Sequence, residues 1–147
     1  MIKAYKYRLL PSEEQKATLD RWIGACRFVY NLGLESKIAA WTSLRKNVTS
    51  FDLIKQLVEL KQTECSWLKD CPAQSLESAL TNLDVAFKKF FKGEGGFPRF
   101  KKRSDRQTIQ FRRWATVKDS KIKLTKIGLI DFIQHRPLGN GEMSWLV

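Results

Sequence analysis

The segment 73–92 carries the most regular hydrophobic pattern of this sequence, and that pattern limits how the chain can fold. Its apolar residues recur at spacings of four, three, four and three, so they share one face of an α-helix. Pro72 before the segment and Gly93 after it are typical of helix boundaries. A helix with such a face must bury it against other elements. The face consists of Leu76, Leu80, Leu83, Phe87 and Phe90.

Two further helices are predicted upstream of this one. Ser12 precedes Gln15 by three residues, which is the spacing of a capping box, and two glutamates follow Ser12 in the first turn. A helix therefore begins here, and its apolar stripe continues to about Leu44. Thr49 or Ser50 can cap the next helix. Together these signals predict a bundle of three or four antiparallel helices.

Strand signals lie on both sides of the helices. Residues 2–9 alternate between apolar and basic side chains, which predicts a short first strand. The chain changes character at a Gly-rich loop, and alternating patterns after it predict strands at 108–112, from Ile122, at 127–133 and at 143–147. The expected fold class is α+β, with a helical insertion in one antiparallel sheet or barrel. The predicted units are the first strand at 1–11, the helical bundle at 12–92, a basic loop at 93–107 and the remaining strands at 108–147.

The charge of the chain is large and unevenly distributed. The 147 residues include 27 Lys and Arg against 15 Asp and Glu, a formal net charge of +12. Residues 88–123 hold thirteen of the basic residues and three of the acidic ones, a net +10 in a quarter of the chain. An excess of this size in a small domain indicates a polyanionic partner. Its concentration in one segment favours nucleic acid over a merely soluble basic surface.

Basic and aromatic side chains are mixed in this segment. Cations bind phosphates with release of counterions, and Gly95 and Gly96 let the backbone approach a bulky ligand. Phe97 and Phe100 can stack on bases, although anchoring a loop to the core is the more usual role of such rings. The candidate phosphate-binding residues are Lys88, Lys89, Lys92, Arg99, Lys101, Lys102, Arg103, Arg106, Arg112 and Arg113.

Two weaker signals point to the same chemistry. The basic residues of the first strand, Lys3, Lys6 and Arg8, either line the same anionic groove or protect an edge strand from aggregation. Polar side chains opposite the apolar face of segment 73–92 can read base edges in a groove, although that side of a helix is usually polar in any case. These candidate base-reading residues are Gln74, Ser78 and Asn82.

The sequence gives little support to an enzyme active site. His135 is the single histidine, so the chain alone builds neither a Ser-His-Asp triad nor a histidine metal cluster. The three cysteines lack the spacing of a zinc site, and Cys26 lies in an apolar pattern typical of a core. The carboxylates are spread over different predicted elements, and no Gly-rich phosphate motif opens a helix. We therefore expect no metal, cofactor or small-molecule substrate in this chain.

The chain also lacks the signals of a membrane or exported protein. No apolar run approaches the ~18 residues of a membrane span, and the N-terminus has no apolar core of a secretory signal. The odd number of cysteines favours a reducing compartment. We expect a soluble, intracellular protein.

Several motifs resemble, in order, those of the TnpB (OrfB) proteins of bacterial and archaeal insertion sequences. Residues 4–15, AYKYRLLPSEEQ, resemble the opening of these proteins, and residues 24–31, GACRFVYN, resemble their next hallmark. The resemblance covers essentially the whole chain, and several motifs in register make it specific. The remaining motifs are WL at 67–68, LDVAFKKFF at 83–91, GFPRFK at 96–101 and HRPL at 135–138.

This resemblance implies an RNA-guided DNA endonuclease related to the compact type V CRISPR effectors. In such proteins a wedge-type β-barrel is interrupted by a helical recognition domain, often catalogued as a helix-turn-helix. A RuvC-like nuclease with an Asp/Glu/Asp metal site and a zinc ribbon follows. Guide pairing supplies sequence specificity while protein contacts hold the backbones. The implied partners are guide RNA and DNA in the bacterial or archaeal cytoplasm. Arg27 and Asn31 match the second motif as candidate backbone contacts, and Tyr30 matches it as a core residue.

The chain departs from the family pattern at its end. It stops at Val147, where the barrel is unfinished, and no counterpart of the nuclease carboxylates or zinc cysteines precedes that point. We therefore expect an N-terminal portion without catalytic residues, inactive alone, with the divalent metal and zinc belonging to a C-terminal part. The alternatives are a stand-alone helix-turn-helix regulator of transposition, a subunit that joins a separate nuclease chain, and a non-binding relic with an open barrel edge.

Overall fold

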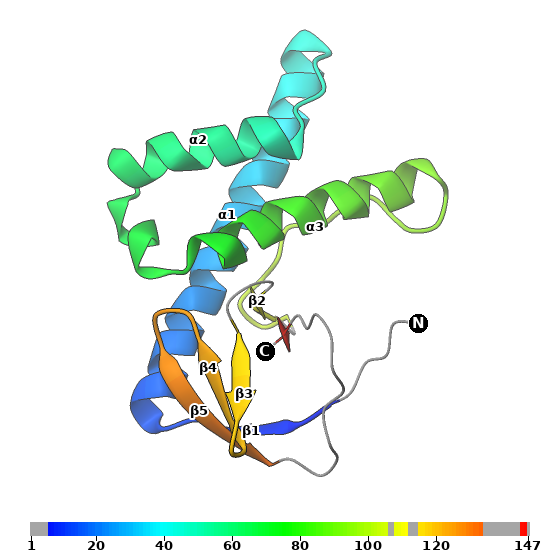
Figure 1. Cartoon of the computed structure of the whole chain (residues 1–147). Helices are drawn as coiled ribbons and strands as arrows, with labels where there is room; N and C mark the ends of the chain where they lie inside the picture. The colour runs from blue at the N-terminus through cyan, green and yellow to red at the C-terminus, as the bar shows by residue number, and fades with distance from the viewer. Residues whose placement is uncertain (1–5, 106–107, 112–114, 134–144, 147) are drawn as a thin grey trace.

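The computed structural model describes residues 6–105, 108–111, 115–133 and 145–146. Over these residues the protein has the expected α+β fold, with three α-helices and an open antiparallel sheet (Figure 1). The elements are β1 (Arg8–Leu10), α1 (Glu13–Leu44), α2 (Ser50–Gln62), the 3-10 helix η1 (Ser66–Asp70), α3 (Ala73–Phe91), β2 (Gln110–Phe111), β3 (Thr116–Lys118), β4 (Lys121–Leu124), β5 (Gly128–Ile133) and β6 (Trp145–Leu146).

Helix α1 begins at the predicted capping box. The Ser12 hydroxyl accepts a hydrogen bond from the Gln15 amide N–H at 3.2 Å, and the Gln15 side-chain oxygen accepts one from the Ser12 N–H at 2.9 Å. The other end of the Gln15 amide donates to the Leu129 carbonyl of β5 at 2.7 Å. One side chain thus starts the helix and ties it to the sheet. The predicted end near Leu44 is also confirmed, because Arg45 leaves the helix with φ 51°.

The other helices also begin and end at local signals. Of the two predicted caps of α2, the structure uses Thr49, whose hydroxyl accepts from the Asp52 N–H at 3.3 Å. Helix α3 follows Pro72 directly. Past its end, Gly93 adopts φ 76°, a left-handed conformation that glycine reaches without a steric penalty.

The main sheet has the strand order β1-β5-β4-β3, with antiparallel pairing throughout. Leu9 of β1 pairs with Phe132 of β5, so α1, α2 and α3 are inserted in sequence between two neighbouring strands. The predicted start of the first strand near residue 2 lies outside the described residues, of which β1 begins at Arg8, and β2 is shorter than predicted. The pattern did not predict β3, which joins β4 through a tight turn with positive φ at Asp119 and Ser120. Strands β2 and β6 form a separate pair.

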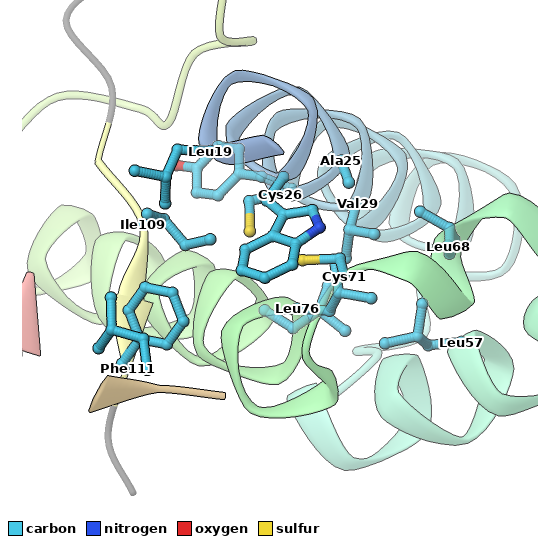
Figure 2. Packing of buried hydrophobic residues seen from close by; sticks show 14 of the residues in the cluster. Leu19, Ala25, Cys26, Val29, Leu57, Leu68, Cys71, Leu76, Ile109 and Phe111 are labelled. Carbon is cyan, nitrogen blue, oxygen red and sulfur yellow. The ribbon is translucent and has the colours of Figure 1, made fainter. Parts of the chain in front are cut away.

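One hydrophobic core joins the helices to the sheet. Figure 2 shows Leu19, Cys26 and Val29 of α1 packed towards Leu76 of α3 and towards Phe111 of β2. The predicted core position of Cys26 is confirmed, since 7% of the residue is exposed. The two strands of the main sheet that face this core alternate between buried and exposed positions, as one-sided packing requires. Their buried residues are Ile122, Leu124, Ile130 and Phe132.

A partly buried ion pair between α1 and α3 also contacts the start of α2. The Lys37 Nζ of α1 lies 2.9 Å from the Asp84 Oδ1 of α3, and their side chains are 9% and 21% exposed. Lys37 also donates to the Val48 carbonyl and lies 5.2 Å from the centre of the Phe87 ring. The Ser50 N–H at the start of α2 donates to Asp84 at 3.2 Å. A desolvated pair with this many partners fixes how the helices meet.

We expect Gly33→Ala to destabilise the protein. A Cβ at this buried position of α1 would lie 2.8 Å from a Leu80 methyl carbon and 3.1 Å from one of Leu83, and both leucines are fully buried. Overpacking outweighs the helix propensity gained, for a net loss of about 1–2 kcal/mol in thermal or urea unfolding. The matched control is Gly24→Ala, whose Cβ meets nothing closer than 3.5 Å and should stabilise the fold. Equal effects of the two changes would contradict the close packing of α1 on α3.

The stability supplied by Asp84 should depend on acid pH. Burial alone would raise the pKa of its carboxyl, but hydrogen bonds from Lys37 and Ser50 outweigh burial and lower that pKa. The stabilisation is therefore present above the unfolded pKa and is lost as the pH falls through the folded pKa. Asp84→Asn should lower the free energy of unfolding by about 2–3 kcal/mol at neutral pH, with convergence on the wild type in acid. If urea titrations give a difference in the free energy of unfolding that does not change with pH, this explanation is wrong.

Candidate nucleic-acid interface

The predicted basic segment forms the end of α3 and the loop that leads to β2. We call residues 93–105 the basic loop, which is the described part of the predicted unit 93–107. Its cations and those of the last turns of α3 are exposed, and none of the described ion pairs involves Lys88, Lys89, Lys92 or Arg99. These groups are therefore available to phosphates. The exposed cations are Lys88, Lys89, Lys92, Arg99, Lys101, Lys102 and Arg103.

Asn31 holds the basic loop against α1. Its side-chain amide donates to the Lys101 carbonyl at 2.9 Å and accepts from the Lys101 N–H at 2.8 Å. These two bonds reproduce the pairing of neighbouring β-strands with one side chain. Both ends of the Asn31 amide are thus engaged within the protein. Its role in this structure is to position Lys101, seventy residues along the chain.

Tyr30, next to Asn31, supports the same contact. The predicted core position of Tyr30 is confirmed, because the residue is 7% exposed, and burial raises the pKa of its hydroxyl. The Lys101 Nζ lies 4.6 Å from the centre of its ring, a cation–π distance. The backbone of Lys101 is therefore fixed by Asn31 and its ammonium group is directed by Tyr30.

A shallow pocket brings together candidates that are far apart in the sequence. Arg27 and Tyr30 of α1, Ser78 and Asn82 of α3, and Lys101 of the basic loop line it. The pocket therefore brings together predicted residues from α1, α3 and the basic loop, including the cations Arg27 and Lys101. Thr108 and Gln110 also line the pocket, and neither was a predicted site residue, because their alternating pattern indicates a strand and not a binding role.

The predicted polar face of α3 packs mainly against the strand region. Gln74 and Ser78 are buried, at 5% and 3% exposure, and Gln74 donates to the Thr125 hydroxyl at 3.0 Å. Ser78 donates to the Gln74 carbonyl at 2.8 Å within the helix. Base edges therefore do not reach Gln74 or Ser78 in this structure. Asn82 is exposed beside the pocket, where its amide lies 3.4 Å from the Gln110 side-chain oxygen.

The remaining candidates lie elsewhere or outside the described residues. Lys6 and Arg8 are exposed at β1, which lies at the bottom of the view in Figure 1, whereas α3 lies above β2. The structure does not bring them into the pocket. Lys3, Arg106, Arg112 and Arg113 are outside the described residues.

The described residues show no sign of a metal site or a membrane span. No group of three or more His, Cys, Asp or Glu side chains is arranged there to hold a metal ion. No described helix combines the length and apolar character needed to cross a membrane.

Comparison with known proteins places these features in a family. The model of the helix-turn-helix domain of IS605 OrfB proteins matches residues 1–46. The described part of that region contains β1 and the single continuous helix α1, so the turn that follows leads to α2 beyond the match.

Three relatives share 34% identity with the chain. InsQ of Escherichia coli K12 and a protein of Streptomyces pristinaespiralis both carry the name of an RNA-guided DNA endonuclease, and they match 92% and 95% of this chain. The chain spans 34% and 36% of their lengths. The virulence protein VsdF of Salmonella dublin matches 70% of the chain, which covers 95% of that relative. The chain therefore belongs to the TnpB/OrfB family of insertion-sequence proteins.

Proposed function

We propose that this chain is the nucleic-acid-binding module of a TnpB-like RNA-guided DNA endonuclease, acting in the cytoplasm on guide RNA and target DNA. The observation that carries the proposal is the exposed cationic surface of α3 and the basic loop, held in place by Asn31. Exposed cations on a fixed backbone bind phosphates with little loss of conformational entropy. The names of the two longer relatives support RNA and DNA as the polyanions.

The fold fits the same proposal. The helices are inserted between β1 and β5 of one sheet, as the family's recognition domain is expected to interrupt its wedge-type barrel. We infer that the described sheet and the β2–β6 pair are parts of that barrel, which is open over the described residues. The nuclease chemistry would then belong to a further part of the full-length protein or to a separate chain.

Replacement of Lys101, Lys102 and Arg103 by Ala should weaken binding and reduce its salt dependence. Each lost phosphate contact lowers the slope of log affinity against log salt by about 0.7–0.9. The measurement is a binding titration at several salt concentrations. Its two probes are structured RNA from the end of the insertion sequence that encodes the chain and duplex DNA from the same end. The matched control replaces the exposed residues Lys16, Lys46 and Lys55, which removes the same charge from α1, α2 and the connection between them. Equal slopes for the two triple variants would refute a local phosphate site.

The two probes also separate this function from its main alternative. The match to a helix-turn-helix model favours a DNA-binding regulator as the second candidate. Such a regulator would bind the duplex without RNA, often as a dimer on spaced half-sites. Preferential, salt-sensitive binding of the structured RNA supports the RNA-guided module instead.

Asn31→Asp should weaken nucleic-acid binding without changing the number of cations in the basic loop. A carboxylate still accepts from the Lys101 N–H but cannot donate to the Lys101 carbonyl, so one of the two bonds is lost. We expect a drop in affinity of about tenfold from a less ordered loop. Asn31→Gln is the companion variant that keeps amide chemistry and charge. The salt slope should stay at the wild-type value in Asn31→Gln, which adds no charge, and a reduced slope in that variant would mean that Asn31 acts otherwise.

A further inference from the structure

Four phenylalanine rings form a cluster at the end of α3. We call Phe87, Phe90, Phe91 and Phe97 the phenylalanine cluster. Phe97 folds back from the basic loop, and its ring meets those of Phe87 and Phe90 edge-on at 5.4 and 5.3 Å between centroids. Phe91 stacks beside Phe87 at 6.3 Å and contacts Phe90 at 5.4 Å. The cluster thus joins the helix to the loop.

The members of the cluster differ in exposure. Phe87 and Phe90 are half-buried, whereas Phe91 is 78% exposed and Phe97 is 48% exposed. Anchoring of the loop explains Phe97, because its edge contacts fix it on the two inner rings. The same reason does not explain Phe91, which adds little buried area and presents most of its ring to solvent. An exposed ring supported from behind by other rings is a platform for another flat group.

The charges around the cluster indicate which flat group it receives. Lys88 and Lys89 lie in the last turn of α3 with Phe90 and Phe91, Lys92 follows the helix directly, and all three are exposed. They form none of the described ion pairs. An apolar protein partner would have to bury these ammonium groups, which carries a large desolvation penalty. A nucleic-acid strand supplies phosphates for the lysines and base faces for the ring together.

We propose that Phe91 stacks on an unpaired base of a single nucleic-acid strand whose phosphates lie on Lys88, Lys89 and Lys92. This inference rests on the proposed function for the phosphate contacts and adds a contact to bases. Paired bases inside a duplex hide their faces, so the site selects unpaired nucleotides. Stacking is tolerant of sequence because every base has an aromatic face. RNA and DNA share this chemistry, and the probes below separate them.

The test measures binding of the full 147-residue chain to labelled oligonucleotides of about twelve nucleotides, by fluorescence anisotropy. The probes are oligo-deoxythymidine, oligouridine and an abasic deoxyribose strand of equal length, which keeps phosphates but has no bases. The variants are Phe91→Leu, which keeps an apolar side chain without a ring, and Phe91→Trp, which keeps a ring. The matched control is Phe51→Leu on α2, since Phe51 is 77% exposed.

We expect Phe91→Leu to bind the base-containing strands about tenfold more weakly and the abasic strand as well as wild type does. Phe91→Trp should restore the affinity, and Phe51→Leu should leave it unchanged. A loss on one of the two base-containing strands supports the inference and identifies that strand as the ligand. An equal loss on the abasic strand, or wild-type binding of all strands by Phe91→Leu, would overturn it.

The outcome is separable from that of the proposed function. Absence of salt-sensitive binding of wild type to every strand would overturn both, because no phosphate contact would exist. If wild type binds the abasic strand and the base-containing strands equally well and with the same salt sensitivity, the stacking site is overturned and the phosphate site is retained. Thermal unfolding of each variant confirms the fold, which an exposed side chain should affect little.

Discussion

Burial of α3 on both of its sides is the constraint on which the rest of the structure depends. Its apolar stripe packs on α1 and α2, with Leu76 and Leu83 fully buried. Its other face carries polar groups, several of which bond to the strand region. Ser75 donates to the Gln110 carbonyl at 2.8 Å, and Gln74 reaches Thr125. Buried polar groups are stable there because each finds a partner. A helix held in this way cannot rotate, so the direction of its cationic end is fixed.

A small number of specific contacts also fixes the position of the basic loop. A run of like charges repels itself and would leave a free loop extended. Two hydrogen bonds from Asn31, the ring of Tyr30 and the edge contacts of Phe97 oppose that tendency at different points. These contacts involve backbone, ring edges and one ammonium group, and the other described cations of the loop remain exposed. The loop is therefore ordered while its cations stay exposed.

Local signals in the sequence were enough to predict the helices. The Ser12–Gln15 capping box and the apolar stripe of α3 act within a few residues, so spacing alone reveals them. Strand β3 was missed because its three residues show no useful alternation and depend on pairing with β4. The burial of the polar face of α3 could not be predicted for a related reason. Gln74 and Ser78 look like surface residues until the strands that cover them are known.

The candidate site likewise has one feature that the sequence predicts and one that it does not. Its cations were predictable, because a net +10 over 88–123 is visible in composition. Their arrangement was not, because the contact between Asn31 and Lys101 spans seventy residues and follows from how α1, α3 and the loop meet. A resemblance in the second motif pointed to Asn31 but not to its task. Composition indicates the class of ligand, whereas tertiary contacts decide which residues touch it.

The position of this surface follows from the topology. The chain leaves the helical layer at Phe91 and enters the strand layer at β2, so the basic loop is the crossing between layers that share one core. A charged segment at such a crossing is exposed, because neither layer can bury it, yet both ends are anchored in rigid elements. The exposed lysines proposed to bind phosphates and the Phe91 ring are therefore presented from one short stretch. A strand bound there would be held by its backbone and by a base together.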